Sequence, residues 1–193
     1  MIRVWRFYKN LLLENRIWTR RISLWGLFWF FVGGILYVYR PDLFQLLLNF
    51  LKQALRDILS QQDQKLAFGT ALLIFKNNLT VAALSLFLGI VFGLIPLVSV
   101  AINFFILGFL AAVFISHHQL VKFLALTVSH GIFELPGFIL ASAFGARLGL
   151  GGVRFVKTHM KYCLQVAPLL IILFFVAAFL EVFVSGKFAL NLR

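Results

Sequence analysis

His130 and Glu134 are the residues of this sequence best suited to chemistry, because both lie inside the apolar run from Phe123 to Phe144. They are four residues apart, so on a helix they occupy one face. A charged side chain at the centre of a bilayer costs about 2.5–3.5 kcal/mol, so such residues usually face a protein partner, a cavity or an ion. The run therefore predicts a membrane-spanning helix with a polar site on its inner face.

Pro136 follows this pair and is expected to open the helix beside it. Proline lacks an N–H and crowds the carbonyl four residues earlier, here that of Ile132, so the sequence predicts a kink. Asn77, Asn78 and Asn103 are candidates to complete the site with amide oxygens.

Two interpretations of this polar site remain open. The pair could be a hydrogen-bonded contact that locks helices together, which contributes about 1–2 kcal/mol in a membrane bundle. It could instead handle protons or cations, because acids and imidazoles inside membranes usually mark ion or proton pathways.

Catalysis is not favoured. The pair supplies two zinc ligands, whereas a catalytic zinc site needs three and a base. His117, His118 and His159 are expected in loops, at the surface or near headgroups. Ser129 points about 100° away from its neighbour His130 on a helix, so the two form no dyad. We therefore predict no enzyme activity, no metal site and no cofactor.

The composition is that of a membrane protein. The 193 residues have a mean hydropathy of +0.99 and are 62% hydrophobic, against roughly 45–50% in soluble domains. The net charge is +12, and the charged residues are concentrated between the apolar runs, where Lys and Arg are expected to contact anionic headgroups. The sequence contains no recognisable nucleic-acid-binding module, so this charge does not indicate binding to nucleic acid. Cys163 is the single cysteine, which excludes an internal disulfide.

We predict an all-α, polytopic transmembrane helical bundle in the cell membrane, with the lipid bilayer as its surroundings and no nucleic-acid partner. A span needs about 20 apolar residues. Five such spans are expected in one membrane domain, 22–193, at approximately 22–39, 79–97, 101–115, 120–144 and 166–184. Residues 1–21 are expected to form a basic interfacial arm and 41–76 interfacial amphipathic helices, with the turn between the second and third spans at Pro96 and Ser99.

Five crossings put the two most basic segments on one side of the membrane. These are the N-terminal arm and the segment from Arg147 to Lys161, which the positive-inside rule assigns to the cytoplasm. Arg147 is expected to be a cytoplasmic anchor, and Glu181 is expected to reach the headgroups. The C-terminus, Lys187 to Arg193, then lies outside.

Small residues recur at every fourth position in the three central spans, which predicts helices packed backbone to backbone. They are Ser85, Gly89, Gly93, Gly108, Ala112, Gly137, Ala141, Gly145 and Gly149. Homodimerisation through these faces is the alternative use of the same pattern.

The residues from Asn77 to Gly149 resemble the stage II sporulation protein M family of bacterial and archaeal membrane proteins. The matching features are Asn77-Asn78, Gly89, Gly93, Asn103, Gly108, His130-Gly131-x-x-Glu134-Leu135, Ala141, Gly145, Leu148 and Gly149. One departure is Phe104, since the family often has glycine after the asparagine.

The resemblance implies a polytopic helical membrane protein. The best-studied relative is needed for engulfment during endospore formation, where it anchors cell-wall-degrading partners at the septal membrane. Most relatives occur in organisms that form no spores, so the sporulation role is not carried over. The sequence thus favours an anchoring or assembly protein with membrane or cell-envelope partners. The alternative is a small cation- or proton-coupled transporter or channel that uses His130 and Glu134.

Overall fold

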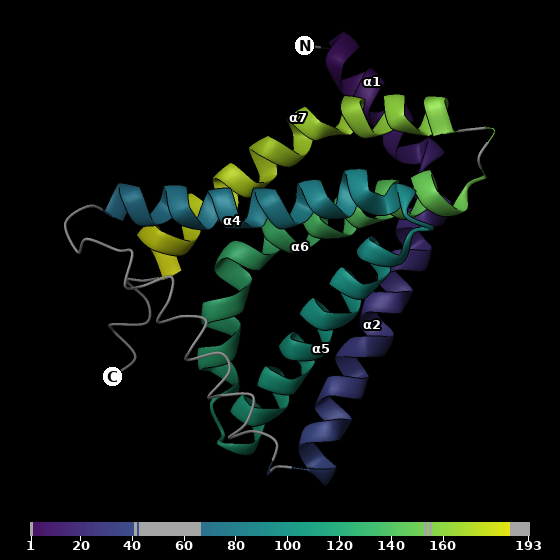
Figure 1. Ribbon diagram of the computed structural model, residues 1–193. Coiled ribbons are helices and arrows are strands. Elements are labelled where there is room, and N and C mark those ends of the chain that lie inside the picture. The colour runs from purple at the N-terminus through teal and green to yellow at the C-terminus, as the bar shows by residue number, and fades with distance from the viewer. Residues whose placement is uncertain (1, 41, 43–66, 153, 155, 186–193) are drawn as a thin grey trace.

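The computed structural model describes residues 2–40, 42, 67–152, 154 and 156–185. No strand occurs in these ranges, and five of their helices are long and apolar enough to cross a membrane. The predicted all-α class and the number of long apolar helices are therefore confirmed. The helices are α1 (Ile2–Glu14), α2 (Arg16–Tyr39), α4 (Ala67–Phe87), α5 (Leu94–Ser116), α6 (Leu120–Leu150) and α7 (Val156–Leu180) (Figure 1). Most of the segment 41–76, in which interfacial helices were predicted, lies outside the described residues, as does the C-terminus that was predicted outside.

The helices form two groups that meet at one end of the molecule (Figure 1). In the first group α2 and α5 run in the same direction, because Trp25 Nε1 donates to the Leu97 carbonyl at 3.0 Å and the Tyr37 hydroxyl lies 2.7 Å from that of Ser116. The second group consists of α4, the C-terminal arm of α6 and α7. Successive long helices run alternately away from and toward the end where the two groups meet (Figure 1).

The second long helix begins earlier than the sequence pattern predicted. We expected a span over 79–97 preceded by interfacial residues up to 76, but α4 runs from Ala67 to Phe87. The expectation was wrong because Asn77 and Asn78 were taken to end the apolar segment before them. In the structure both lie in the middle of a continuous helix, where they line a cavity.

The turn into α5 also differs from its predicted place at Pro96 and Ser99. It lies at residues 88–93, where a 3₁₀ turn (Leu88–Ile90) leads to Gly93 in the left-handed conformation with φ 66°. Glycine adopts this conformation without steric cost. Pro96 falls in the first turn of α5, where the missing N–H costs no helical hydrogen bond.

Three further helix ends differ from the predicted spans because basic residues do not end these helices. We expected spans to start at 22, to end at 144 and to start at 166, whereas α2 starts at Arg16, α6 continues to Leu150 and α7 starts at Val156. Long cationic side chains can extend from a helix end to water, so the helix continues through them.

Helix α2 ends at Tyr39, two residues before Pro41, because the residue that precedes a proline is disfavoured in helical conformation. The guanidinium of Arg40 then donates to the carboxylate of Asp42 at 2.8 Å, and this hydrogen bond raises the pKa of Arg40. Both side chains are exposed, so the pair contributes little to stability.

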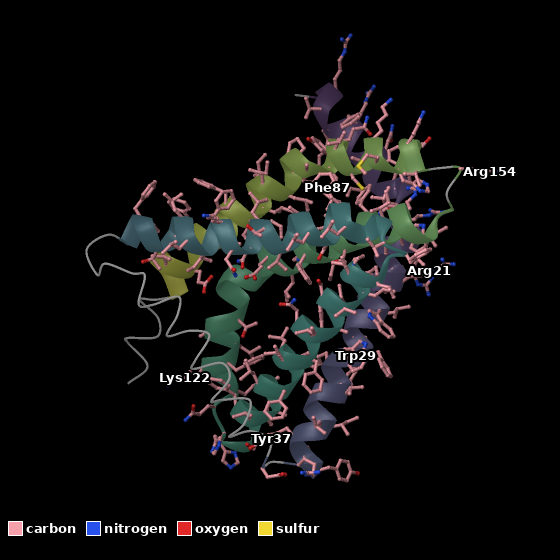
Figure 2. All side chains as sticks on the ribbon, in the orientation of Figure 1. Arg21, Trp29, Tyr37, Phe87, Lys122 and Arg154 are labelled. Carbon is pink, nitrogen blue, oxygen red and sulfur yellow. The ribbon has the colours of Figure 1, made fainter. Side chains whose placement is uncertain are left out.

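Apolar side chains form both the core and much of the outer surface. The largest buried ones include Phe109, Phe144 and Phe174, while Phe28 and Phe31 of α2 are more than half exposed. An exposed apolar surface of this extent suits contact with lipid. Figure 2 shows Arg21 and Arg154 at one end of the molecule and Lys122 and Tyr37 at the other, with Trp29 between the two ends.

Candidate functional site

Four of the predicted site residues line one cavity of about 120 Å³. Asn77 and Asn78 come from α4, Asn103 from α5 and Glu134 from α6. The rest of the wall is apolar and consists of Val81, Leu135, Phe138 and Phe174. The structure therefore brings together polar side chains from three helices that are far apart in the sequence.

Asn103 is oriented by its own helix. Its amide nitrogen donates to the Ser99 carbonyl one turn earlier at 2.8 Å. This hydrogen bond uses the amide nitrogen and not the amide oxygen of Asn103, which lines the cavity. Asn103 and Asn77 are exposed and Asn78 is half-buried, so the polar part of the cavity opens to the outside of the protein.

Glu134 is half-buried on α6 and has a second carboxylate near it. Glu181, in the π-helical segment Glu181–Ser185 after α7, lies close enough for the two charges to interact. That Glu181 reaches the headgroups stays a prediction, and the structure adds that Glu181 lies near Glu134. No local sequence pattern relates two acids that are this far apart in the chain.

His130 lies one helical turn before Glu134 on α6. The orientation of its side chain lies outside the described residues, so the structure fixes only its position along the helix. Figure 1 shows that α6 changes direction along its length. Pro136 is the proline inside this helix, and its missing N–H accounts for such a bend.

The other histidines are not part of this cavity. His117 and His118 are exposed in the turn between α5 and α6. His159, which we expected at the surface, is instead buried in the first turns of α7, against Gly151. Among the described residues, no three His, Cys, Asp or Glu side chains gather as metal ligands would.

The second group of helices is packed backbone to backbone at small residues. A Cβ atom at Gly145 would overlap the Ser85 carbonyl, and one at Gly149 would overlap Gly89 and Gly93. A Cβ at Gly137 would lie 3.2 Å from the Phe174 ring, and Ala141 is fully buried. These contacts hold α4 against α6 and α6 against α7.

The first group is also packed through glycines. The sequence pattern identified Gly108 of α5 but not the glycines of α2. A Cβ at Gly108 would overlap the Phe30 carbonyl of α2, and one at Gly33 would overlap the Phe105 carbonyl of α5. Phe104 occupies the space over Gly26 with its ring, so the departure from the family pattern is packed against a glycine. Gly26 and Gly33 are seven residues apart, and this spacing was the available signal. Ala112 is half-buried one turn beyond Gly108.

Arg147 joins the end of α6 to the N-terminal segments. Its guanidinium donates to the Glu14 carbonyl at 3.2 Å and to the Asn15 side-chain oxygen at 3.3 Å, and it lies 4.8 Å from the centre of the Tyr162 ring. Asn15 is fully buried in the break between α1 and α2. Arg147 therefore links three segments within the protein, whereas we had expected only an anchor to the membrane surface.

The comparisons with known proteins decide the family. The model of the stage II sporulation protein M family matches residues 23–186, which is most of the chain. The chain belongs to the stage II sporulation protein M family. This match confirms the resemblance and extends it well beyond the residues from Asn77 to Gly149. It includes the four polar residues of the cavity and the small residues at the helix contacts.

Two archaeal proteins are similar to this member of the stage II sporulation protein M family. The uncharacterized protein MJ0706 of Methanocaldococcus jannaschii is 34% identical over 129 residues, which are 61% of this chain and 56% of that protein. The uncharacterized protein MJ0793 of the same organism is 29% identical over 126 residues, or 60% of this chain and 71% of that protein. The matched region thus spans little more than half the length of the first relative. No solved structure matches the chain.

Proposed function

We propose that this protein is a membrane-embedded anchoring or assembly protein, on which membrane or cell-envelope proteins gather. Family membership and the five apolar helices support this proposal. The observation that carries it is the close packing of the helices, because two sets of glycine contacts bring backbone against backbone. A closely packed set of helices suits a protein that holds others in place, and the proposal includes no catalysis.

Helix α1 is the element best placed to present a partner surface. It projects from the end of the molecule where the two helix groups meet (Figure 1). Trp5 is 70% exposed and Val4 60% exposed, and they alternate with the exposed cations Arg3, Arg6 and Lys9. Aromatic and cationic side chains are common at both protein interfaces and membrane surfaces.

Photo-crosslinking in membranes of the native host tests the anchoring role. A photoreactive amino acid is placed at Trp5 and, as a matched control, at Phe31, an apolar residue of α2 that is 57% exposed. We expect a discrete protein adduct from position 5 and none from position 31. If a folded protein gives no protein adduct from position 5, α1 does not bind a partner and this version of the proposal is wrong.

The cavity favours a second candidate function, the passage of cations or protons. Amide and carboxyl side chains that line a cavity at membrane depth are typical of ion and proton pathways. Purified protein in liposomes should then give a flux that depends on pH or on the cation, and Glu134→Gln should abolish it. Asp42→Asn is the matched control, because Asp42 is an exposed carboxylate outside the helices. Liposomes without flux would exclude this function and leave the anchoring role intact.

A further inference from the structure

We propose that the cavity between α4, α5 and α6 binds a monovalent metal cation, with the side chains of Asn77, Asn78, Asn103 and Glu134 around it. This inference uses the same cavity as the second candidate function, but it requires only binding and not passage. It therefore also fits an anchoring protein whose helices a bound cation holds together.

The chemistry of the lining selects a cation. Its polar side chains are three amides and one carboxylate, and no Lys or Arg belongs to the described lining. Carbonyl and carboxylate oxygens are the ligands of hard metal cations. The nearby Glu181 carboxylate adds negative charge without lining the cavity. The field in the cavity therefore attracts cations and repels anions.

The hydrogen bonds of the asparagines leave oxygen atoms for a ligand. The Asn103 nitrogen donates to the Ser99 carbonyl, so its side-chain oxygen is the atom that remains for a cation in the cavity that Asn103 lines. Asn77 and Asn78 make no side-chain hydrogen bond with other residues that the structure describes. Polar groups at membrane depth need partners, because an unpaired one in hydrocarbon costs several kcal/mol. A cation with one or two waters would give all three amides a partner.

The ligands in the cavity favour a monovalent ion. The cavity of about 120 Å³ has room for a cation and bound water. One carboxylate belongs to the lining, so the cavity offers a single charged ligand beside three amides. Calcium and magnesium sites use more ligands, often several carboxylates, and magnesium keeps several waters.

Thermal unfolding of the whole protein in detergent tests the inference, with helical circular dichroism as the readout. Sodium chloride is compared with the chloride of a bulky organic cation at equal ionic strength. A bound cation stabilises the folded state by mass action, so we expect the melting temperature to rise with sodium by about 5–10 °C when sodium is about 100 times the Kd. Magnesium chloride at equal ionic strength should not reproduce this rise.

Two variants locate the site. Asn103→Leu removes the amide oxygen at an exposed position that tolerates a change of side chain. Glu134→Gln removes the negative charge. Each variant should lose most of the sodium-dependent rise in melting temperature. Asn10→Leu, the same substitution at an exposed position of α1, should keep the full rise. If Glu134→Gln fails to fold, the result for Asn103→Leu alone decides whether the sodium site lies in this cavity.

The inference is overturned if sodium has no effect, if magnesium acts as well as sodium, or if Asn103→Leu keeps the rise. Flux in liposomes separates this inference from the proposed functions. Sodium binding without flux supports the site and contradicts transport. Absence of sodium binding overturns the site, and the crosslinking test of the anchoring role is unaffected by either result.

Discussion

Arg147 connects residues that no local sequence pattern connects. Its partners Glu14 and Asn15 lie more than 130 residues away in the chain, and Tyr162 lies on the next helix. Asn15 is fully buried, so its side-chain oxygen depends on this guanidinium for a hydrogen bond. A buried polar group without its partner is costly.

Replacing Arg147 should therefore loosen the N-terminal helix. Arg147→Ala removes two charge-assisted hydrogen bonds and a stacked contact with Tyr162, so we expect the free energy of unfolding to fall by about 1–3 kcal/mol. Cleavage of α1 by added protease should become faster. Arg154→Ala, at an exposed arginine of the loop that follows, should change stability by less than about 0.5 kcal/mol. Equal effects of the two substitutions would contradict the link.

At the scale of single residues, the sequence predicted the polar residues of the cavity but not the contacts of Arg147. Polar residues inside apolar runs are conspicuous, so Asn77, Asn78, Asn103 and Glu134 could be selected without a structure. Arg147 looked like one of many cations near a helix end. Its role comes from a contact in space with Asn15, which a single sequence does not encode locally.

The helices are held together mainly where glycine replaces a side chain. The contacts of Gly33 with Phe105 and of Gly108 with Phe30 tie α2 to α5. Gly33 and Gly34 are adjacent on α2 but differ in the space available for a side chain. A Cβ at Gly33 would overlap a carbonyl, whereas one at Gly34 would lie 3.5 Å from the Gly108 carbonyl.

This difference gives a matched pair of substitutions on α2. Gly33→Ala should lower the free energy of unfolding by about 1–3 kcal/mol, because the added methyl forces the backbones apart. Gly34→Ala has room for the methyl and should be neutral or stabilising by up to about 1 kcal/mol through helix propensity. Chemical unfolding in mixed detergent micelles measures both. The reverse order of stabilities would show that α2 and α5 do not pack as described.

Gly93 is a second test at the scale of elements, because it forms the turn between α4 and α5. With φ at 66°, an alanine here is strained, and its Cβ would lie 2.8 Å from the Leu150 side chain. We expect Gly93→Ala to cost about 1–3 kcal/mol in the same assay. Gly131→Ala is the control, since the nearest atom to its Cβ lies 3.6 Å away. A stable Gly93→Ala variant would contradict the position of the turn.

The number of long helices could be predicted from hydropathy, but two of their boundaries depended on tertiary structure. Asn77 and Asn78 interrupt an apolar segment in the sequence, yet the cavity accepts their amides inside one helix. The uncharged stretch after Leu79 had to turn somewhere, and Pro96 was the obvious signal. The turn instead lies at Gly93, because a proline in the first turn of a helix does not end it.

At the scale of the whole molecule, the directions of the long helices decide at which end of the protein each turn lies. The break at Asn15, the turn at Gly93 and the end of α6 at Leu150 lie at the end where the two helix groups meet. The turn with His117 and His118 follows the opposite end of α5. Basic residues of α1 and of the segment after α6 are therefore close to each other in space.

Labelling of single cysteines from the two sides of a membrane tests this arrangement. Lys9→Cys and Arg154→Cys should react with a membrane-impermeant thiol reagent from one side, and His117→Cys from the other, since Lys9 is exposed on α1 and the other two positions are exposed between helices. The natural Cys163 is fully buried and should stay unreactive, which provides the background. Reaction of positions 9 and 154 from opposite sides would contradict the alternating crossings.

The continuity of α6 has a mechanical consequence. The arm of α6 that follows Pro136 carries Phe138 at the cavity and Arg147 at the N-terminal segments. A tilt of its C-terminal arm that changed the shape of the cavity would also displace the guanidinium that holds the start of α2. Occupancy of the cavity and the position of helix α1 would then be coupled through the C-terminal arm of α6.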